Sequence, residues 1–148
     1  MKKVRMAIIG LGNRGYGNMQ AVMSFDDVQI TALCGVYTDR AETAAAKAEE
    51  KYGVRPFSTT DYREVLTRGD VDCVMIATAW ESHVPIAIDT MRAGKPVALE
   101  VGGAYSAEDC RNLVSTYEET KTPFLFLENC CYDRTELLVT AMARKGLI

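Results

Sequence analysis

The most constraining feature of this sequence is a glycine-rich turn that directly follows an apolar run near the N-terminus. Residues 4–9 form the apolar run, and the chain then reads Gly10-Leu11-Gly12-Asn13-Arg14-Gly15, with glycines at G-x-G-x-x-G spacing. A helix-compatible segment and a second apolar run, residues 28–36, come next. The alternative is a purely structural turn, but a strand, such a turn, a helix and a second strand are typical of dinucleotide-binding units. We therefore interpret the turn as a pyrophosphate-binding loop.

Each glycine of the turn has its own expected role. Gly10 makes the tight turn, and Gly12 lets the backbone approach a phosphate with no side chain in the way. Gly15 lets the following helix pack closely on the strand. The helix N-terminus offers free N–H groups and a partial positive charge to an anion, with Asn13 and Arg14 beside it. Arg14 either contacts a phosphate or stays solvated, as most surface arginines do.

Composition narrows the function classes. The 148 residues suffice for one domain with its own core, so we expect a single dinucleotide-binding domain over residues 1–148. Lys and Arg number 17 and Asp and Glu 20, a net charge of −3 without a basic run, which argues against nucleic acid and anionic membranes as partners. The N-terminal apolar stretch is too short to span a membrane and lacks a cleavage site, so we expect a cytoplasmic protein.

Metal binding is not expected. The chain has five cysteines without C-x-x-C spacing and a single histidine, so it offers no zinc pattern and no second imidazole for acid–base chemistry. Most of the cysteines lie in apolar runs, which predicts buried, reduced thiols. The five are Cys34, Cys73, Cys110, Cys130 and Cys131.

Apolar runs alternate with helical patterns along the whole chain. Pro85 lies near the start of one expected helix, and Ser106 with Asp109 resembles a capping box that opens another. Asp133 with Glu136 repeats this pattern before a last helix. Such alternation predicts an α/β fold, a doubly wound parallel sheet of the Rossmann type in a three-layer αβα arrangement. Ligands of these sheets bind beyond the carboxyl ends of the strands, where the strand order reverses.

The end of the second strand bears on the choice of cofactor. A dinucleotide domain usually places an acid there, about 20 residues beyond the last glycine, to bind the adenosine ribose 2′-hydroxyl. This chain has Gly35 at that place, and Thr38 and Arg40 follow, which leaves space, a hydroxyl and a guanidinium for a 2′-phosphate. The pattern favours NADP over NAD. If Asp39 turns inward instead, the cofactor is NAD.

Two further strand ends carry polar or aromatic side chains. Thr78-Ala79-Trp80 follows the third long apolar run, with His83 close behind, and Glu100 ends the next strand. His83 either serves the cofactor side of the crevice or caps and packs, and Trp80 either covers the cofactor or is simply exposed. Glu100 either faces the same crevice or binds neighbouring backbone N–H groups. We take all five residues as candidate cofactor contacts.

These residues together resemble the Gfo/Idh/MocA oxidoreductases, the family of glucose-fructose oxidoreductase and inositol 2-dehydrogenase. The resemblance covers the whole chain: the glycine loop, the Thr78-Ala79 turn with His83 where the family has Thr-Pro-Asn and a histidine, and the Ala-Gly-Lys-Pro-Val lead-in at residues 93–97. It implies NAD(P)-dependent hydride transfer on a sugar- or polyol-like substrate, held by a second, mostly antiparallel domain beginning near Gly146. The chain would then be an isolated cofactor domain, and we expect the full-length form to be a homo-oligomer.

Two positions depart from the family pattern. Gly35 resembles the NADP-using members, and Val101 stands where the family has the lysine of Glu-Lys-Pro, which helps bind and polarise the reacting alcohol or carbonyl. The catalytic residues therefore stay unassigned. The stretch 127–134 resembles a divergent branch, the NAD-dependent α-N-acetylgalactosaminidases, which also lack that lysine and cleave a glycosidic bond by transient oxidation. In that branch Asn129 and Tyr132 are candidates for the substrate side or, equally, for packing between domains.

The sequence is compatible with three functions. The first is the cofactor domain of a Gfo/Idh/MocA-type oxidoreductase, and the second is that of a glycosidase of the divergent branch. Both need the same bound cofactor, and they differ in whether turnover changes its net redox state. The third is a regulator that senses NAD(P)H without turnover. In each case we expect the isolated chain to bind the cofactor and to catalyse nothing.

Overall fold

The computed structural model describes residues 3–148, and its centre is a six-stranded parallel sheet. The strands are β1 (Val4–Ile9), β2 (Val28–Cys34), β3 (Phe57–Thr59), β4 (Cys73–Ile76), β5 (Val97–Glu100) and β6 (Phe124–Leu127). Their order in the sheet is β3-β2-β1-β4-β5-β6, and every neighbouring pair is parallel. The order reverses between β1 and β4, which is the switch point of a doubly wound sheet. The predicted Rossmann-type fold is confirmed.

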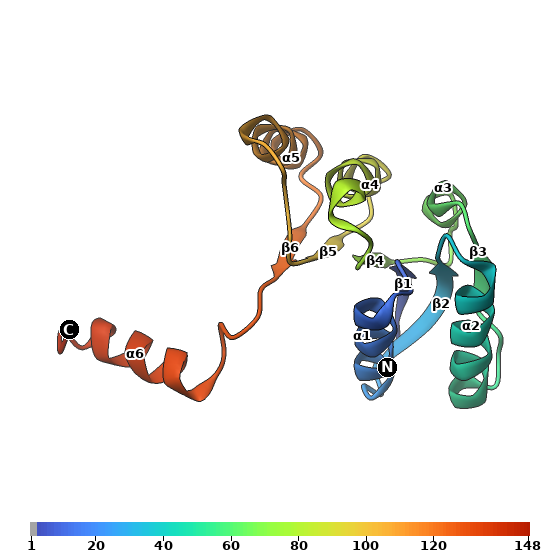
Figure 1. The fold of residues 1–148 in the computed structure, drawn as a ribbon, viewed down its shortest axis with the longest axis horizontal. Coiled ribbons are helices and arrows are strands. Elements are labelled where there is room, and N and C mark those ends of the chain that lie inside the picture. Colours follow the sequence, from blue (N-terminus) through green and yellow to red (C-terminus); the bar gives the residue numbers. More distant parts are fainter. Residues whose placement is uncertain (1–2) are drawn as a thin grey trace.

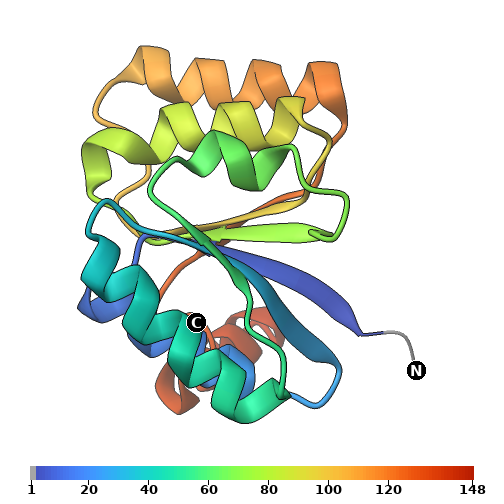
Figure 2. The same cartoon turned by 90° about the vertical axis from the view of Figure 1, so that its right-hand side faces the viewer.

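Helices cover both faces of the sheet and complete the three layers (Figures 1 and 2). One face carries α1 (Asn13–Met23) and α2 (Thr38–Tyr52), and the other carries α3 (Tyr62–Leu66), α4 (Trp80–Arg92) and α5 (Ala107–Thr120). The last helix is α6 (Arg134–Arg144). Among residues 3–148, no helix is both long and apolar enough to cross a membrane.

The core forms because successive side chains of a strand point to opposite faces. In β1, Ala7 and Ile9 pack in the cluster under α3, α4 and α5, whereas Ile8 packs in the cluster under α1 and α2. All three are essentially inaccessible to solvent. Buried strands of this kind read as continuous apolar runs, which is why the sequence pattern located them correctly. The small side chains of α2 let that helix lie close to the sheet; its buried residues are Ala41, Ala44, Ala45 and Ala48.

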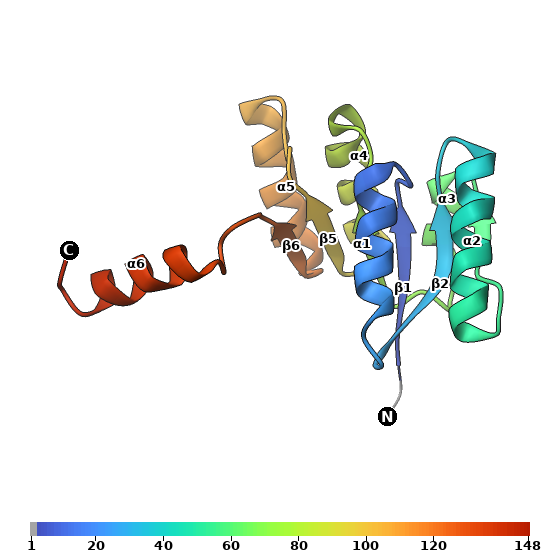
Figure 3. The same cartoon turned by 60° about the horizontal axis from the view of Figure 1, so that its bottom comes forward.

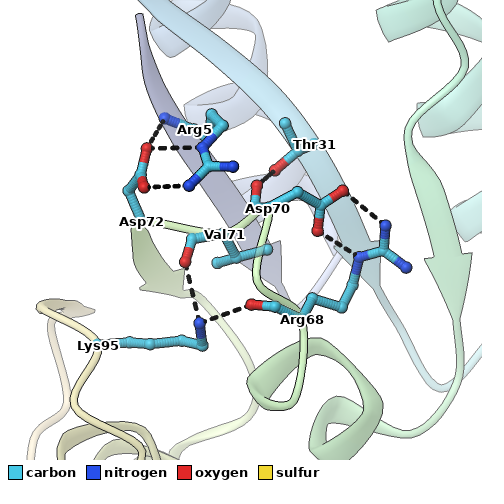
Figure 4. Close-up of polar contacts among 7 residues, drawn as sticks. All are labelled: Arg5, Thr31, Arg68, Asp70, Val71, Asp72 and Lys95. Carbon is cyan, nitrogen blue, oxygen red and sulfur yellow. Dashed lines mark hydrogen bonds and ion pairs between the residues drawn. The ribbon is translucent and has the colours of Figure 1, made fainter.

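A polar cluster ties the amino-terminal edge of the sheet together (Figure 4). The carboxylate of Asp72 accepts hydrogen bonds from the backbone N–H of Arg5 at 2.9 Å and from its guanidinium at 3.0 and 2.6 Å. Lys95 Nζ donates to the carbonyl oxygens of Arg68 and Val71 at 2.8 and 2.9 Å. These contacts join β1, the loop before β4 and the loop before β5 at the edge opposite the carboxyl ends of the strands.

Helix α4 begins earlier than the sequence predicted. We expected Pro85 near its start, but the helix starts at Trp80 and Pro85 lies inside it. The backbone N–H of Ser82 donates to the carbonyl of Ala79 at 3.0 Å, and this bond begins the helix one turn before the proline. Proline lacks an N–H, so the carbonyl four residues earlier loses its partner. That residue, Glu81, is exposed, so water can satisfy its carbonyl.

The two expected capping boxes have different outcomes. At α5, Ser106 Oγ accepts from the N–H of Asp109 at 3.0 Å, and Asp109 accepts from the N–H of Ser106 at 3.1 Å, which confirms the box. At α6, Asp133 makes no side-chain capping bond, so that prediction is wrong. Helix α6 buries none of its residues and extends away from the sheet (Figures 1 and 3). Because α6 buries none of its residues, no packing fixes how the chain enters this helix. The capping pattern in the sequence does not by itself determine the geometry of the first turn.

The expectation of buried thiols is wrong for three of the five cysteines. Cys34 is buried in β2 and Cys73 is half-buried at the start of β4, whereas Cys110, Cys130 and Cys131 are exposed. The exposed ones lie on the outer side of α5 and in the loop before α6, where apolar neighbours in sequence do not mean burial. All five are free thiols. Burial raises the pKa of the Cys34 thiol to about 12, so this side chain is an inert part of the core.

Candidate functional site

A cavity of about 840 Å³ opens at the carboxyl edge of the sheet, at the switch point between β1 and β4. The loops that follow β1, β2 and β4 form its walls. Of the thirteen residues that the sequence named as cofactor contacts, eight line it: Gly10, Gly12, Asn13, Arg14, Gly35, Arg40, Thr78 and Ala79. The other lining residues are Ile9, Leu11, Cys34, Val36, Tyr37, Thr60, Tyr62, Ala77, Glu81, Ser82, Pro85 and Ile86.

The three glycines of the first loop have distinct surroundings. Gly10 has φ +99°, and an added Cβ would lie 2.5 Å from the backbone of Ala77 in the neighbouring strand's exit loop. A Cβ on Gly15 would overlap the carbonyl oxygen of Gly10. Both glycines are therefore required by close packing of backbone on backbone. Gly12 differs, because a Cβ there would meet no atom within 4 Å.

The open space beside Gly12 lies at the start of α1. Gly12 is the N-cap residue of this helix and offers no side-chain cap. The first N–H groups of a helix have no intrahelical partner and carry a partial positive charge. Asn13 and Arg14, which supply the first of these groups, line the cavity beside Gly12. The residues present thus fit a bound phosphate group.

The end of β2 forms the second wall. Gly35 lines the cavity, and Arg40 lies with its guanidinium carbon 4.5 Å from the centre of the Tyr37 ring. Arg40 and Tyr37 both line the cavity, whereas Thr38 and Asp39 do not. Stacking on the ring orients the guanidinium while its N–H groups remain able to bind an anion. This end of the cavity is therefore cationic.

Tyr62, from α3, lines the same end and was not anticipated from the sequence. Its hydroxyl donates to the carboxylate of Asp89 in α4 at 2.6 Å. Burial and this hydrogen bond raise the pKa of Tyr62 to about 12, so the hydroxyl stays protonated. Tyr62 and Tyr37 reach the cavity from segments that are distant in sequence. An aromatic residue shortly after an expected strand end is the only signal that could have found them.

The loop after β4 forms the third wall and is held from beneath by His83. Thr78 and Ala79 line the cavity, but His83 does not, and it is 1% exposed. Its Nε2 lies 3.1 Å from the carbonyl oxygen of Thr78. Because a carbonyl can only accept, Nε2 carries the hydrogen, and the buried Nδ1 has no partner. Burial lowers the pKa of His83, so the imidazole is neutral and acts as a support for the loop.

Trp80 lies at the rim beyond this wall. It is the first residue of α4, its side chain is not part of the cavity lining, and the residue is 56% exposed. One side of its indole lies against the backbone of Gly102 in the loop after β5, where an added Cβ would overlap the ring. Gly102 has φ +112°, a conformation that favours glycine. The indole is thus supported on one side and open on the other.

Glu100, at the end of β5, is occupied by neighbouring donors. Its carboxylate accepts from the backbone N–H of Val101 at 2.8 Å and from Asn18 Nδ2 at 3.2 Å, and it lies 3.7 Å from Arg14 Nε. The residue is 9% exposed and does not line the cavity.

Of the substrate-side candidates, Tyr132 is 85% exposed in the loop before α6. Neither Tyr132 nor Asn129 lines the cavity.

The parallel doubly wound sheet, the glycine loop and the cavity at the switch point define the class of this protein as a nucleotide-binding Rossmann domain. Residues 4–127 match the family described as "Oxidoreductase family, NAD-binding Rossmann fold". The chain belongs to this Gfo/Idh/MocA family.

Individual relatives span more than this chain. An α-N-acetylgalactosaminidase of Shewanella oneidensis is 38% identical, over 99% of this chain and 33% of that protein. An α-N-acetylgalactosaminidase of Bacteroides fragilis is also 38% identical, over 97% of this chain and 35% of its own length. The crystal structure of an NAD-binding protein from Listeria innocua is similar with a TM-score of 0.82 at 25% identity, over 98% of this chain and 41% of that one. The chain thus spans about a third of the length of the two curated relatives.

Proposed function

We propose that this chain binds an NAD(P) cofactor in the cavity at the switch point. It would serve as the cofactor domain of an enzyme that moves a hydride between nicotinamide and a sugar- or polyol-like substrate. The observation that carries the proposal is the contrast among the loop glycines. Gly10 and Gly15 are closed in by backbone, whereas Gly12 faces open space next to the N-terminus of α1. A glycine with empty space beside it at a helix N-terminus is what a pyrophosphate needs.

The test is calorimetric titration of NAD and NADP into the wild-type chain and two variants. Gly12→Val should fold normally, because its Cβ meets no atom, and should lose binding, because its methyl groups occupy the phosphate path. Gly17→Val is the matched control: it lies one turn further along α1, also has no atom within 4 Å of an added Cβ, and should bind like wild type. A folded Gly12→Val chain with wild-type affinity would refute the assignment.

At the adenosine end, we propose a preference for NADP. Gly35 and Arg40 line the cavity with Tyr37 stacked beneath the guanidinium, while Asp39 lies outside the lining. Gly35→Asp should shift preference toward NAD by about tenfold or more, since a carboxylate accepts from a 2′-hydroxyl and repels a 2′-phosphate. Gly35→Asn controls for the added bulk, which would press on Leu11 with Cβ atoms 3.3 Å apart. Tighter binding of NAD than NADP by the wild-type chain would contradict the preference.

A second candidate function is the cofactor domain of a glycosidase that oxidises its substrate transiently. Two observations favour it: the 38% identity to α-N-acetylgalactosaminidases, and Val101 in place of the lysine expected for a family dehydrogenase. Both functions use the same cavity. Assays of the full-length form with polyols and with aryl α-N-acetylgalactosaminides separate them, because only the dehydrogenase accumulates reduced cofactor.

For the 148 residues alone, we propose cofactor binding without turnover. Hydride transfer needs a substrate carbon held near the nicotinamide and a group that takes or gives the hydroxyl proton. His83 is buried beneath the Thr78 loop, and the Glu100 carboxylate already accepts hydrogen bonds from Val101 and Asn18. Incubation with NAD(P) and either substrate panel should yield neither reduced cofactor nor released aglycone. Clear turnover would show that a complete active site lies within these residues.

A further inference from the structure

We propose that the β4 side of the cavity selects the oxidised, positively charged form of the nicotinamide ring, through the indole of Trp80 and the carboxylate of Glu81. This inference rests on the proposed function, because it concerns one half of the cofactor assigned to the cavity.

The direction of the bound dinucleotide follows from the walls of the cavity. The cationic end with Gly35 and Arg40 lies beyond β2, and the open glycine lies at the start of α1. A dinucleotide extends across the switch point with its pyrophosphate at the helix N-terminus. With the adenosine beyond β2, the nicotinamide half has to lie beyond β4. The first residues of α4 are at that end: Glu81 lines the cavity, and Trp80 lies at its rim.

The indole of Trp80 has one face covered by Gly102, and more than half of the residue is exposed between Ala79 and Glu81, which both line the cavity. The covered face lies against Gly102, a residue whose φ of +112° and missing side chain leave room for the indole. Because the contact with Gly102 already restricts the ring, the indole loses little conformational freedom when a ligand stacks on its open face. Trp80 is more than half exposed, which is unusual for the largest apolar side chain next to a cavity.

The charged side chains along the cavity match the charges of the oxidised cofactor, with arginines where its phosphates would lie and a carboxylate where its cationic ring would lie. Arg14 and Arg40 lie at the phosphate-binding and adenosine ends, and Glu81 is the only carboxylate among the lining residues. The nicotinamide of the oxidised form is a cationic pyridinium, whereas the reduced ring is neutral. A cation is attracted by the face of an indole and by a carboxylate. Glu81 also offsets the partial positive charge of the α4 N-terminus, which alone would repel the pyridinium.

The first test compares dissociation constants for the oxidised and reduced dinucleotide. Trp80→Leu and Glu81→Gln should each weaken binding of the oxidised form by about threefold and leave the reduced form nearly unchanged. Two matched controls should change neither constant: Tyr117→Leu removes an exposed aromatic from α5, and Glu108→Gln removes an acid from the first turn of α5. Equal losses for both redox forms would overturn the proposal.

A second measurement uses the fact that Trp80 is the only tryptophan in the sequence. The oxidised dinucleotide should quench Trp80 fluorescence on binding, whereas ADP-ribose or its 2′-phosphate, which lack the nicotinamide, should bind with little quenching. The same response to both ligands would place the nicotinamide away from Trp80 and overturn the inference while leaving the cavity assignment intact. If neither ligand binds, the proposed function itself fails, and this inference fails with it.

Discussion

At the scale of single residues, one amino-acid type serves different purposes within a few positions. Gly10 and Gly15 are glycines because backbone from another element occupies the place of a side chain, whereas Gly12 is one where only open cavity lies beside it. Gly17, in α1, is not enclosed by backbone and does not line the cavity. Its only effect on stability is the low helix propensity of glycine. Mutational tests at these positions therefore separate folding from binding.

Gly15→Ala and Gly17→Ala should have opposite effects on stability. The added methyl group of Gly15→Ala would overlap the Gly10 carbonyl, and relieving that overlap should cost about 1–3 kcal/mol of unfolding free energy. Gly17→Ala meets open space and should gain about 0.5–1 kcal/mol, since alanine has the higher helix propensity. Urea unfolding of both variants checks this. A Gly15→Ala chain as stable as wild type would contradict the described packing of α1 on the loop.

His83 gives the domain a pH dependence of known sign. Burial lowers the pKa of its imidazole below the ordinary value of 6.5, against the opposing effects of Thr78, Glu100 and Glu81. The unfolded chain therefore takes up a proton at higher pH than the folded chain does. The unfolding free energy should fall as the pH drops below about 6.5, until the folded-state pKa is passed. His83→Gln can still donate to Thr78 and should lose this component. Equal pH slopes for wild type and variant, by urea unfolding, would contradict the assignment.

Among the helices, similar capping patterns in the sequence have different outcomes: one forms its capping hydrogen bonds and the other does not. Ser106 and Asp109 exchange hydrogen bonds at the start of α5, a helix that packs on α4, whereas Asp133 makes no such bond at the start of α6. The same pattern of residue types thus has different consequences according to the packing that follows.

Ser106→Ala should lower the free energy of unfolding by about 1 kcal/mol, because the N–H of Asp109 loses its acceptor. Asp133→Ala should change it by less than about 0.5 kcal/mol, since no capping bond is lost. Thermal or urea unfolding of the two variants measures the difference. Equal effects of the two substitutions would show that the α5 cap does not stabilise the domain.

The sequence predicted those features that depend on local pattern. Strands such as Cys73–Ile76 are buried on both faces and so appear as unbroken apolar runs, and the glycine spacing located the cavity beside Gly12. Features that depend on contacts between distant segments were missed. Trp80 meets Gly102 through tertiary packing that no local pattern encodes, and for Tyr62, which reaches the cavity from α3, the only local signal is an aromatic residue shortly after an expected strand end.

In the molecule as a whole, the two edges of the sheet differ in structure. The amino-terminal edge is closed by Asp72 bonded to Arg5, and by Lys95 bonded to backbone carbonyls (Figure 4). The carboxyl edge is open at the switch point, where the loops after three strands form one cavity. In doubly wound folds, ligands bind in the crevice outside the carboxyl ends of the strands, and the loops around it are positioned by the sheet.

Backbone amide NMR signals, followed during titration with NAD or NADP, test the proposed cofactor site most directly. We expect saturable shift changes concentrated around the cavity, at Gly12, Arg14, Gly35 and Ala79, with none at the Asp72 edge. Amides near a newly bound pyrophosphate experience its charge directly, whereas those across the sheet do not. Shift changes centred on the amino-terminal edge, or no saturable change with either dinucleotide, would contradict the claim that this cavity is a cofactor site.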